Sequence, residues 1–412
     1  MSSLTTIVKR KKIALFVGGL GSDGNFFNQT IQKLNSKAPT LTKVYSEIID
    51  MSDFSVTNKQ FVGVSSGSLF PSSKALEAFN LKIAEVVNLA NSNTNTTIMV
   101  KTKLDFKPDS VANGKIVYKS YESIDNQSIK LIKIIESIKQ LDSSIEIILV
   151  GHSQGGLVNL KTATEIPNKI KNIVSISTPY SPVTTAYLLR TVEFVANIFN
   201  TSVYPYFSAG DYEEYEKRVK TLSDSKYLTD LKTKWNKLSK RPSLTVIAGI
   251  SAHLMTSQYF TIFFVPFEIN HRYPFDGLVM GREQVDIDHC DLHVLHNPEV
   301  ECYEKSDGFT HSCCSQFGLI NNHNCKCALP CLDISSAILK SGLSSLESMI
   351  KQGEVKLEEL PVIKALIEGI NGEACSNENY RQYYEVIGGN YSHKNIVIQN
   401  DTIGLILGVF TK

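Results

Sequence analysis

Short apolar runs rich in valine and isoleucine alternate with helix-like segments along much of this chain. The strand-like runs are Ile13–Val17, Lys43–Ile49, Glu146–Val150, Ile173–Ser177 and Leu244–Ala248. The helix-like segments between them are Phe26–Leu34, Lys74–Asn91, Ser128–Gln140 and Leu157–Glu165. The last of these strands are near-continuous apolar runs, which are typical of parallel sheets that helices cover on both faces. The alternation therefore predicts an α/β fold built on a mostly parallel, doubly wound sheet.

Two further β-branched stretches leave their place in the fold open. Residues Thr96–Lys103 and Lys115–Tyr121 have the composition of strands. They can pair with each other as a hairpin, or they can add strands to the main sheet.

The overall charge is close to neutral. The 412 residues include 42 basic and 41 acidic side chains, for a formal net charge of +1. The longest basic run is Lys9–Lys12, so neither charge nor clustering indicates a nucleic-acid partner.

The N-terminal region has a basic patch followed by an apolar run, as signal peptides do. The run Ile13–Val17 is short, however, and the glycine-rich stretch Gly18–Gly24 follows it. A buried strand that enters a glycine loop explains this pattern better than a signal peptide. No apolar run reaches the roughly 20 residues of a membrane span, so the sequence assigns no compartment.

One stretch, "IILVGHSQGGLVNL" (Ile147–Leu160), places a serine between glycines where a strand becomes a helix. A strand, a sharp glycine-flanked turn and a helix together form a nucleophile elbow, which exposes a serine hydroxyl above the sheet. The amide of Gln154, at the start of the helix, can then donate to an oxyanion. The pattern favours Ser153 as a nucleophile over an inert serine in a tight connection.

The motif and its surroundings resemble those of the α/β-hydrolase lipases and esterases. "VGHSQGGLV" is followed by "IVSISTPYSP", and the N-terminal "ALFVGGLGSDGNFF" resembles the oxyanion loop of that family. Gly18 stands where the family often has histidine, but such loops act through backbone amides. The resemblance implies that the amide of Leu20 is a second oxyanion donor beside Gln154. The alternatives are a plain glycine loop and a phosphate-binding loop, although the stretch lacks the lysine of a P-loop.

The resemblance also implies an acid and a base after the nucleophile, in the order Ser, Asp, His. In "HRYPFDGLVMGREQ", Asp276 resembles the family's Asp-Gly-Val-Val turn, whereas Asp307 is a competitor within a cysteine-rich stretch. In "GGNYSHKNIVIQND", His393 resembles the family's C-terminal histidine loop. We therefore expect a catalytic triad of Ser153, Asp276 and His393, whose long gap between acid and base implies an insertion.

That gap contains a cysteine-rich region, which we expect to be an insertion over residues 286–376. All eight cysteines lie within it: Cys290, Cys302, Cys313, Cys314, Cys325, Cys327, Cys331 and Cys375. Disulfides, zinc ligation and free thiols all remain open, since the spacing matches no clean zinc motif. Disulfides would favour an exported protein. Asp286, Asp288 and Asp291 form an acidic loop, for which solvation is favoured over calcium binding; we expect no metal or other cofactor.

A second insertion is expected at residues 179–240, after the Ser-Thr-Pro strand. The resemblance implies a lid over an acyl pocket. Helical spacing there puts Leu188, Val192 and Val195 or Ile198 on one apolar face. This face either contacts a membrane surface transiently or packs on the domain. The whole chain, 1–412, is then one α/β-hydrolase domain with two insertions.

These features predict a serine hydrolase that cleaves carboxylic esters through an acyl-serine intermediate. A lipase or phospholipase acting on a lipid or other acyl ester is the leading hypothesis. A lipid acyltransferase and a non-catalytic relative that binds lipid or protein are the alternatives.

The cysteine region yields a test. Paired cysteines predict few or no thiols available to an alkylating agent without reductant, measured by intact mass spectrometry. Stoichiometric zinc in the purified protein would favour the metal site instead, and eight alkylated thiols without zinc would contradict both.

Overall fold

The computed structural model describes sixteen parts of the chain. They are residues 10–19, 24–52, 54–57, 60–63, 73–104, 110–112, 115–117, 123–182, 225–250, 252–262, 265–276, 279, 281–296, 391, 393 and 395–412.

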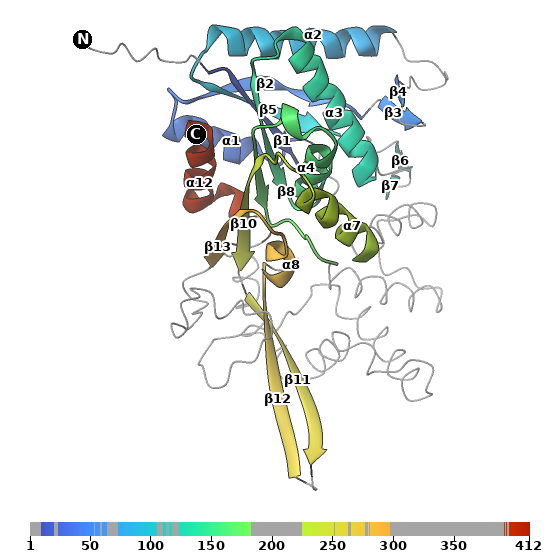
Figure 1. Ribbon diagram of the computed structural model, residues 1–412, viewed down its shortest axis with the longest axis vertical. Helices are drawn as coiled ribbons and strands as arrows, with labels where there is room; N and C mark the ends of the chain where they lie inside the picture. The colour runs from blue at the N-terminus through green and yellow to red at the C-terminus, as the bar shows by residue number, and fades with distance from the viewer. Residues whose placement is uncertain are drawn as a thin grey trace, which may run out of the picture.

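A seven-stranded sheet forms the centre of the molecule, in the order β13-β10-β9-β8-β1-β5-β2 (Figure 1). From β1 onward in the chain, the strands are β1 (Lys12–Val17), β2 (Thr42–Asp50), β5 (Thr97–Lys103), β8 (Glu146–His152), β9 (Asn172–Ile176), β10 (Ser243–Ile250) and β13 (Asp291–His296). Every neighbouring pair is parallel. The carboxyl ends of the strands therefore meet at one edge, where ligands bind in such sheets.

Helices cover both faces of the sheet, as the sequence predicts. Along β1, Ile13, Leu15 and Val17 belong to one apolar core, whereas Ala14 and Phe16 belong to the other. The first core is covered by α2 (Ser73–Ser92), α3 (Ile124–Leu141), α4 (Gln154–Glu165) and α7 (Ser225–Asn236). The second is covered by α1 (Asn28–Lys37) and α12 (Asn400–Thr411), on the opposite side in Figure 1. Burial on both faces explains the continuous apolar runs.

The structure resolves the two ambiguous stretches differently. Residues Thr97–Lys103 form β5 inside the main sheet. Lys115–Val117 forms β7, which pairs with β6 (Ser110–Ala112) in a separate two-stranded hairpin. Two further antiparallel strands, β3 (Phe54–Thr57) and β4 (Gln60–Gly63), form another small hairpin.

A long hairpin lies between β10 and the predicted acid, where the sequence indicated no strands. Its strands, β11 (Ala252–Ile262) and β12 (Val265–Phe275), pair along their whole length and extend away from the sheet (Figure 1). The chain then returns to the sheet through Asp276, α8 (Gly281–Val285) and β13. The hairpin therefore leaves the sheet at the end of β10, and the chain then returns to the same carboxyl edge of the sheet.

Part of each predicted insertion belongs to the main domain. From the range 286–376, Asp291–His296 forms the edge strand β13, paired with β10; residues 297–390 lie outside the described parts of the chain. From the range 179–240, α7 packs against α4, and the fully buried Trp235 donates from its indole nitrogen to the carbonyl of Asp288 at 3.0 Å. Residues 183–224 again lie outside the described parts. No described helix is long and apolar enough to cross a membrane.

The start of α4 lies against the end of β1 with no room for a side chain. A methyl group on Gly155 would overlap the carbonyl of Val17, and one on Gly156 would overlap the side chain of Thr178. The obstacle at Gly155 is backbone of a central strand, which cannot rotate away. Glycine at position 155 therefore allows α4 to begin in direct contact with the end of β1.

We expect Gly155→Ala to lower the free energy of unfolding by about 3 kcal/mol, at the upper end of overpacking costs. The control is Gly404→Ala, in the interior of α12, where an added methyl meets nothing within 4 Å. Because alanine favours helix over glycine, this control should stabilise the protein by about 0.5–1 kcal/mol. Urea titration of both variants checks the pair; equal effects would contradict the packing argument.

Candidate active site

Ser153 occupies a strained turn between β8 and α4. Its φ of 53° and ψ of −129° place it as the N-cap of α4 in a conformation that L-residues rarely adopt. The turn is held by two hydrogen bonds: the amide of Ser153 donates to the carbonyl of Ile176 at 2.9 Å, and that of Gly156 to Ser153 at 3.0 Å. The neighbouring strand β9 thus holds the serine at the carboxyl edge of the sheet, in the conformation of a nucleophile elbow.

The glycine loop after β1 lies next to this serine. A methyl group on Gly19 would lie 2.9 Å from Cβ and 3.4 Å from Oγ of Ser153. Leu20, the second expected oxyanion donor, lies just beyond the described residues. Gln154 is the first residue of α4, so its amide has no carbonyl partner within the helix. Its buried side chain accepts from Gln127 Nε2 on α3 at 3.4 Å.

Asp276 is fully buried, and its two carboxylate oxygens have separate partners. Oδ1 accepts from the amide of Val279 at 2.7 Å, and Oδ2 lies 2.7 Å from Nδ1 of His393. Because the carboxylate can only accept, the imidazole nitrogen donates. A buried carboxylate needs such donors to offset the loss of water.

Gln284 on α8 attaches this turn to the sheet, a role that no sequence motif indicates. Its side chain exchanges hydrogen bonds with the backbone of Gly249, accepting from N at 2.8 Å and donating to O at 3.1 Å. The same amide donates to the carbonyl of Val279 at 3.1 Å. The Asp276 turn is therefore anchored to β10.

The structure brings His393 to Asp276 although 117 positions separate them in the chain. The backbone amide of His393 also donates to the carbonyl of Asp276 at 2.7 Å. The ring of His393 contacts that of His152, the residue before Ser153, with centroids 4.7 Å apart. No hydrogen bond joins the Ser153 hydroxyl to the imidazole among the described contacts; such bonds often form only with substrate present.

His152 contributes to the site in a way that the sequence motif alone did not indicate. It is buried, and its Nε2 lies 2.6 Å from the carbonyl oxygen of His393. Burial, and to a smaller degree the neighbouring His393, lowers the pKa of His152 well below 6.5. His152 is therefore neutral at physiological pH.

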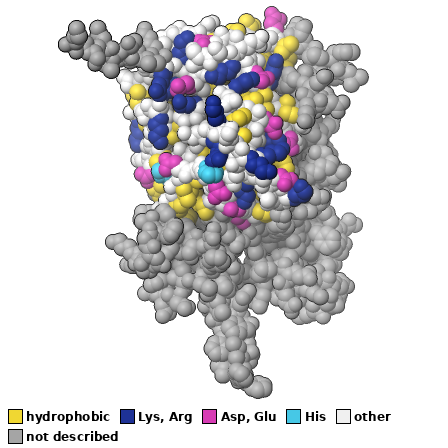
Figure 2. All heavy atoms as spheres, in the orientation of Figure 1, with side chains coloured by type: hydrophobic (Ala, Val, Ile, Leu, Met, Phe, Trp, Pro, Cys, Tyr) yellow, Lys and Arg dark blue, Asp and Glu magenta, His cyan; other side chains and the backbone are white. Residues whose placement is uncertain are grey.

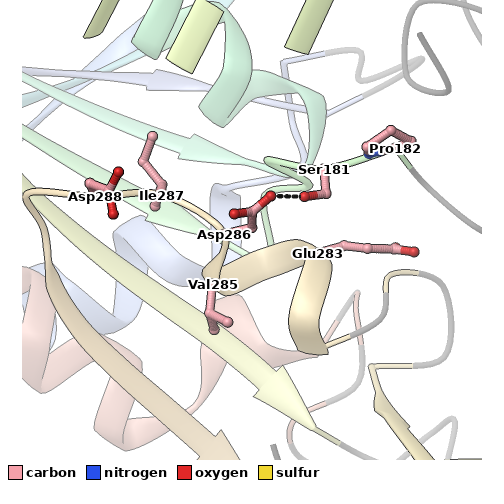
Figure 3. A pocket seen from close by; sticks show the side chains of 7 residues that line it. All are labelled: Ser181, Pro182, Glu283, Val285, Asp286, Ile287 and Asp288. Atoms are coloured by element: carbon pink, nitrogen blue, oxygen red, sulfur yellow. Dashed lines mark hydrogen bonds between the residues drawn. The ribbon is translucent and has the colours of Figure 1, made fainter. Parts of the chain in front are cut away.

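Asp286 and Asp288 line a separate pocket of about 440 Å³ beside α8 (Figure 3), whereas Asp291 begins β13. Asp286 and Ser181 point toward each other there, and Asp286 also pairs with Lys232. Asp288 accepts from Asn236 at 3.0 Å. The described residues include no group of three side chains that could hold a metal ion. The pocket is lined by none of the three triad candidates.

Of the eight cysteines, only Cys290 lies in the described parts of the chain. Its thiol is unpaired there and donates to the carbonyl of Ile287 at 3.4 Å. Burial raises the pKa of this thiol, so it is not an activated nucleophile.

The visible face of the sheet domain carries interspersed basic and acidic side chains (Figure 2).

A family model described as a PGAP1-like alpha/beta domain matches residues 70–236. The match covers less than half of the chain; it includes Ser153 but ends before Asp276 and His393. None of the curated proteins matches the chain.

Several solved structures are similar to this one at low identity. A phospholipase from Legionella pneumophila has 10% identity over 64% of this chain and 49% of its own, with a TM-score of 0.31, so this chain spans about half its length. A gene product of Listeria innocua has 12% identity over 71% and 86%, with a TM-score of 0.35. A Bacillus licheniformis lipase has 11% identity over 70% and 84%, with a TM-score of 0.34.

The fold is that of an α/β-hydrolase. The seven-stranded parallel sheet with helices on both faces, and the family match across the β8–α4 turn, agree on this. The resemblance indicated by the sequence motifs is confirmed at the level of the fold.

The neutral state of His152 predicts a pH dependence of stability. Its pKa is lowered in the folded protein but stays near 6.5 in the unfolded chain, so the unfolded state binds more protons below that pH. The contribution of His152 to the free energy of unfolding is therefore full above pH 6.5. It is lost as pH falls toward the folded pKa, by up to about 1.4 kcal/mol per pH unit. In urea titrations, the stability of wild type relative to His152→Gln should therefore fall as pH falls from 7 to 5. A difference that stays constant would contradict the prediction.

Proposed function

We propose that the protein is a serine hydrolase that cleaves carboxylic esters through an acyl-Ser153 intermediate. The observation that carries the proposal is the 2.7 Å hydrogen bond between Asp276 and His393. The ring of His393 in turn contacts His152, the residue before the strained, glycine-flanked Ser153. The chain order Ser, Asp, His is that of the α/β-hydrolases.

In the proposed first step, Ser153 Oγ attacks the ester carbonyl and transfers its proton to Nε2 of His393. Nδ1–H of the same ring donates to Asp276, which holds the tautomer and stabilises the imidazolium. The oxyanion accepts from the amide of Gln154, and from that of Leu20 if the glycine loop acts as the motif implies. When the alcohol leaves, it takes the proton from His393.

In the second step, water attacks the acyl-enzyme. His393 accepts one proton from this water as the new bond forms and returns it to Ser153 Oγ, which releases the carboxylic acid. The sum is ester plus water giving acid plus alcohol. If another alcohol replaces water, the same intermediate yields a transferred acyl group, which is the acyltransferase alternative.

We propose lipid esters as the substrate class, because the elbow and the Ser-Thr-Pro strand resemble those of lipases. The apolar helical face predicted within residues 179–240 supports a lid that contacts a lipid surface. A comparison of soluble short-chain esters with dispersed long-chain esters and phospholipids tests this assignment.

We expect Ser153→Ala to reduce kcat for ester hydrolysis by about 10⁴-fold or more, with His393→Ala nearly as severe. Since triad members act as a unit, the double variant should lose little beyond Ser153→Ala. The measurement is initial-rate hydrolysis by proteins shown to be folded by circular dichroism.

The matched control is Ser92→Ala, which removes an exposed hydroxyl that donates to the carbonyl of Asn88 at the end of α2. It should keep wild-type turnover. Near-normal activity in folded Ser153→Ala, or independent losses that multiply in the double variant, would exclude the triad.

A further inference from the structure

The ring of His152 is fixed between two aromatic neighbours. Phe26 stacks on it with centroids 4.6 Å apart and an interplanar angle of 25°. His393 lies against it at 4.7 Å and 53°. Phe26 is itself held edge-on by Phe27 at 5.1 Å. With only 4% of its surface exposed, the imidazole has little freedom to rotate.

One atom of this ring determines what it does. Nε2 lies 2.6 Å from the carbonyl oxygen of His393, and a carbonyl can only accept. Nε2 therefore carries a hydrogen, and in a neutral ring Nδ1 then carries none. His152 donates its single N–H to the backbone of His393.

This bond completes the attachment of His393 at three points. Asp276 supplies two of them, through its carbonyl to the His393 amide and through Oδ2 to Nδ1, each at 2.7 Å. The third comes from His152, which is covalently next to Ser153. Asp276 thus orients the imidazole, and His152 attaches the same loop to the nucleophile's own turn.

We infer that His152 is a positioning residue, which holds His393 at the distance and angle that proton transfer from Ser153 requires. It acts through His393 and does not itself touch the substrate. The inference rests on the proposed function, since it assigns a role within that site. An error of about 1 Å in such placement can cost about 100-fold in rate.

The chemistry of the position predicts which replacements work. Glutamine can place an amide N–H near the position of Nε2 and restore the bond. Asparagine is too short to reach, and phenylalanine keeps the ring contact with Phe26 but has no donor. The donor, rather than the ring alone, is the property that the position needs.

The experiment compares His152→Gln, His152→Asn and His152→Phe, with His289→Asn as the control. His289 is exposed before β13 at a φ of 57°, which asparagine tolerates. We expect asparagine and phenylalanine to lower kcat on a short-chain ester by about 100-fold with little change in KM. Glutamine should restore most of kcat, and the control should match wild type.

Two further readouts separate positioning from simple stability. In the His393→Ala background, the His152 variants should cost no additional activity, although their effect on thermal stability should persist. In proton NMR, the downfield signal of the His393 Nδ1–H bonded to Asp276 should be sharp in wild type and His152→Gln, and broadened or absent in His152→Asn.

The inference is overturned if folded His152→Phe keeps wild-type kcat, or if all three variants lose activity equally through KM. It is also overturned if the downfield signal is unchanged in His152→Asn. Since the NMR signal does not depend on turnover, it tests His152 even if wild type hydrolyses no ester. A wild-type protein that hydrolyses no ester would contradict the proposed function, separately from the inference about His152.

Discussion

The whole site depends on how closely the β8–α4 turn approaches the end of β1. Side chains at Gly155 and Gly156 would overlap Val17 and Thr178, so α4 can begin there only because both residues are glycine. A helix that starts this close to the sheet leaves the preceding residue in a strained turn, and Ser153 accordingly has a φ of 53°. The close packing around Gly155 and Gly156 can hold this strained conformation in place.

A second constraint returns a distant part of the chain to this turn. After β10 the chain makes the long β11–β12 hairpin and then comes back at Asp276, whose turn Gln284 ties to β10. His393, outside the sheet, meets Asp276 through both backbone and side chain. Because His152 also holds the carbonyl of His393, the acid, the imidazole and the serine turn form one connected hydrogen-bonded unit rather than three separate loops.

The buried strands and the serine turn could be predicted from the sequence because each depends on residues that lie close together in the chain. Continuous apolar runs follow from burial on both faces, and the glycines follow from the close contacts of α4 with Val17 and Thr178. The edge strand Asp291–His296 was not predicted, since its polar residues and nearby cysteines obscured the pattern. The helix α7 carries mostly polar residues, although its Trp235 is buried. The Asp276–His393 pair came from chain order and resemblance; no local pattern predicts a contact across 117 positions, nor the roles of Gln284 and His152.

The most direct test of the central claim is to map the residue that a fluorophosphonate modifies. The probe reacts with a serine only when a neighbouring base and an oxyanion site activate it. Peptide mass spectrometry should find one stoichiometric adduct, on Ser153, and His393→Ala should label much more slowly. A folded protein that takes no label, or takes it on another serine, would contradict the account.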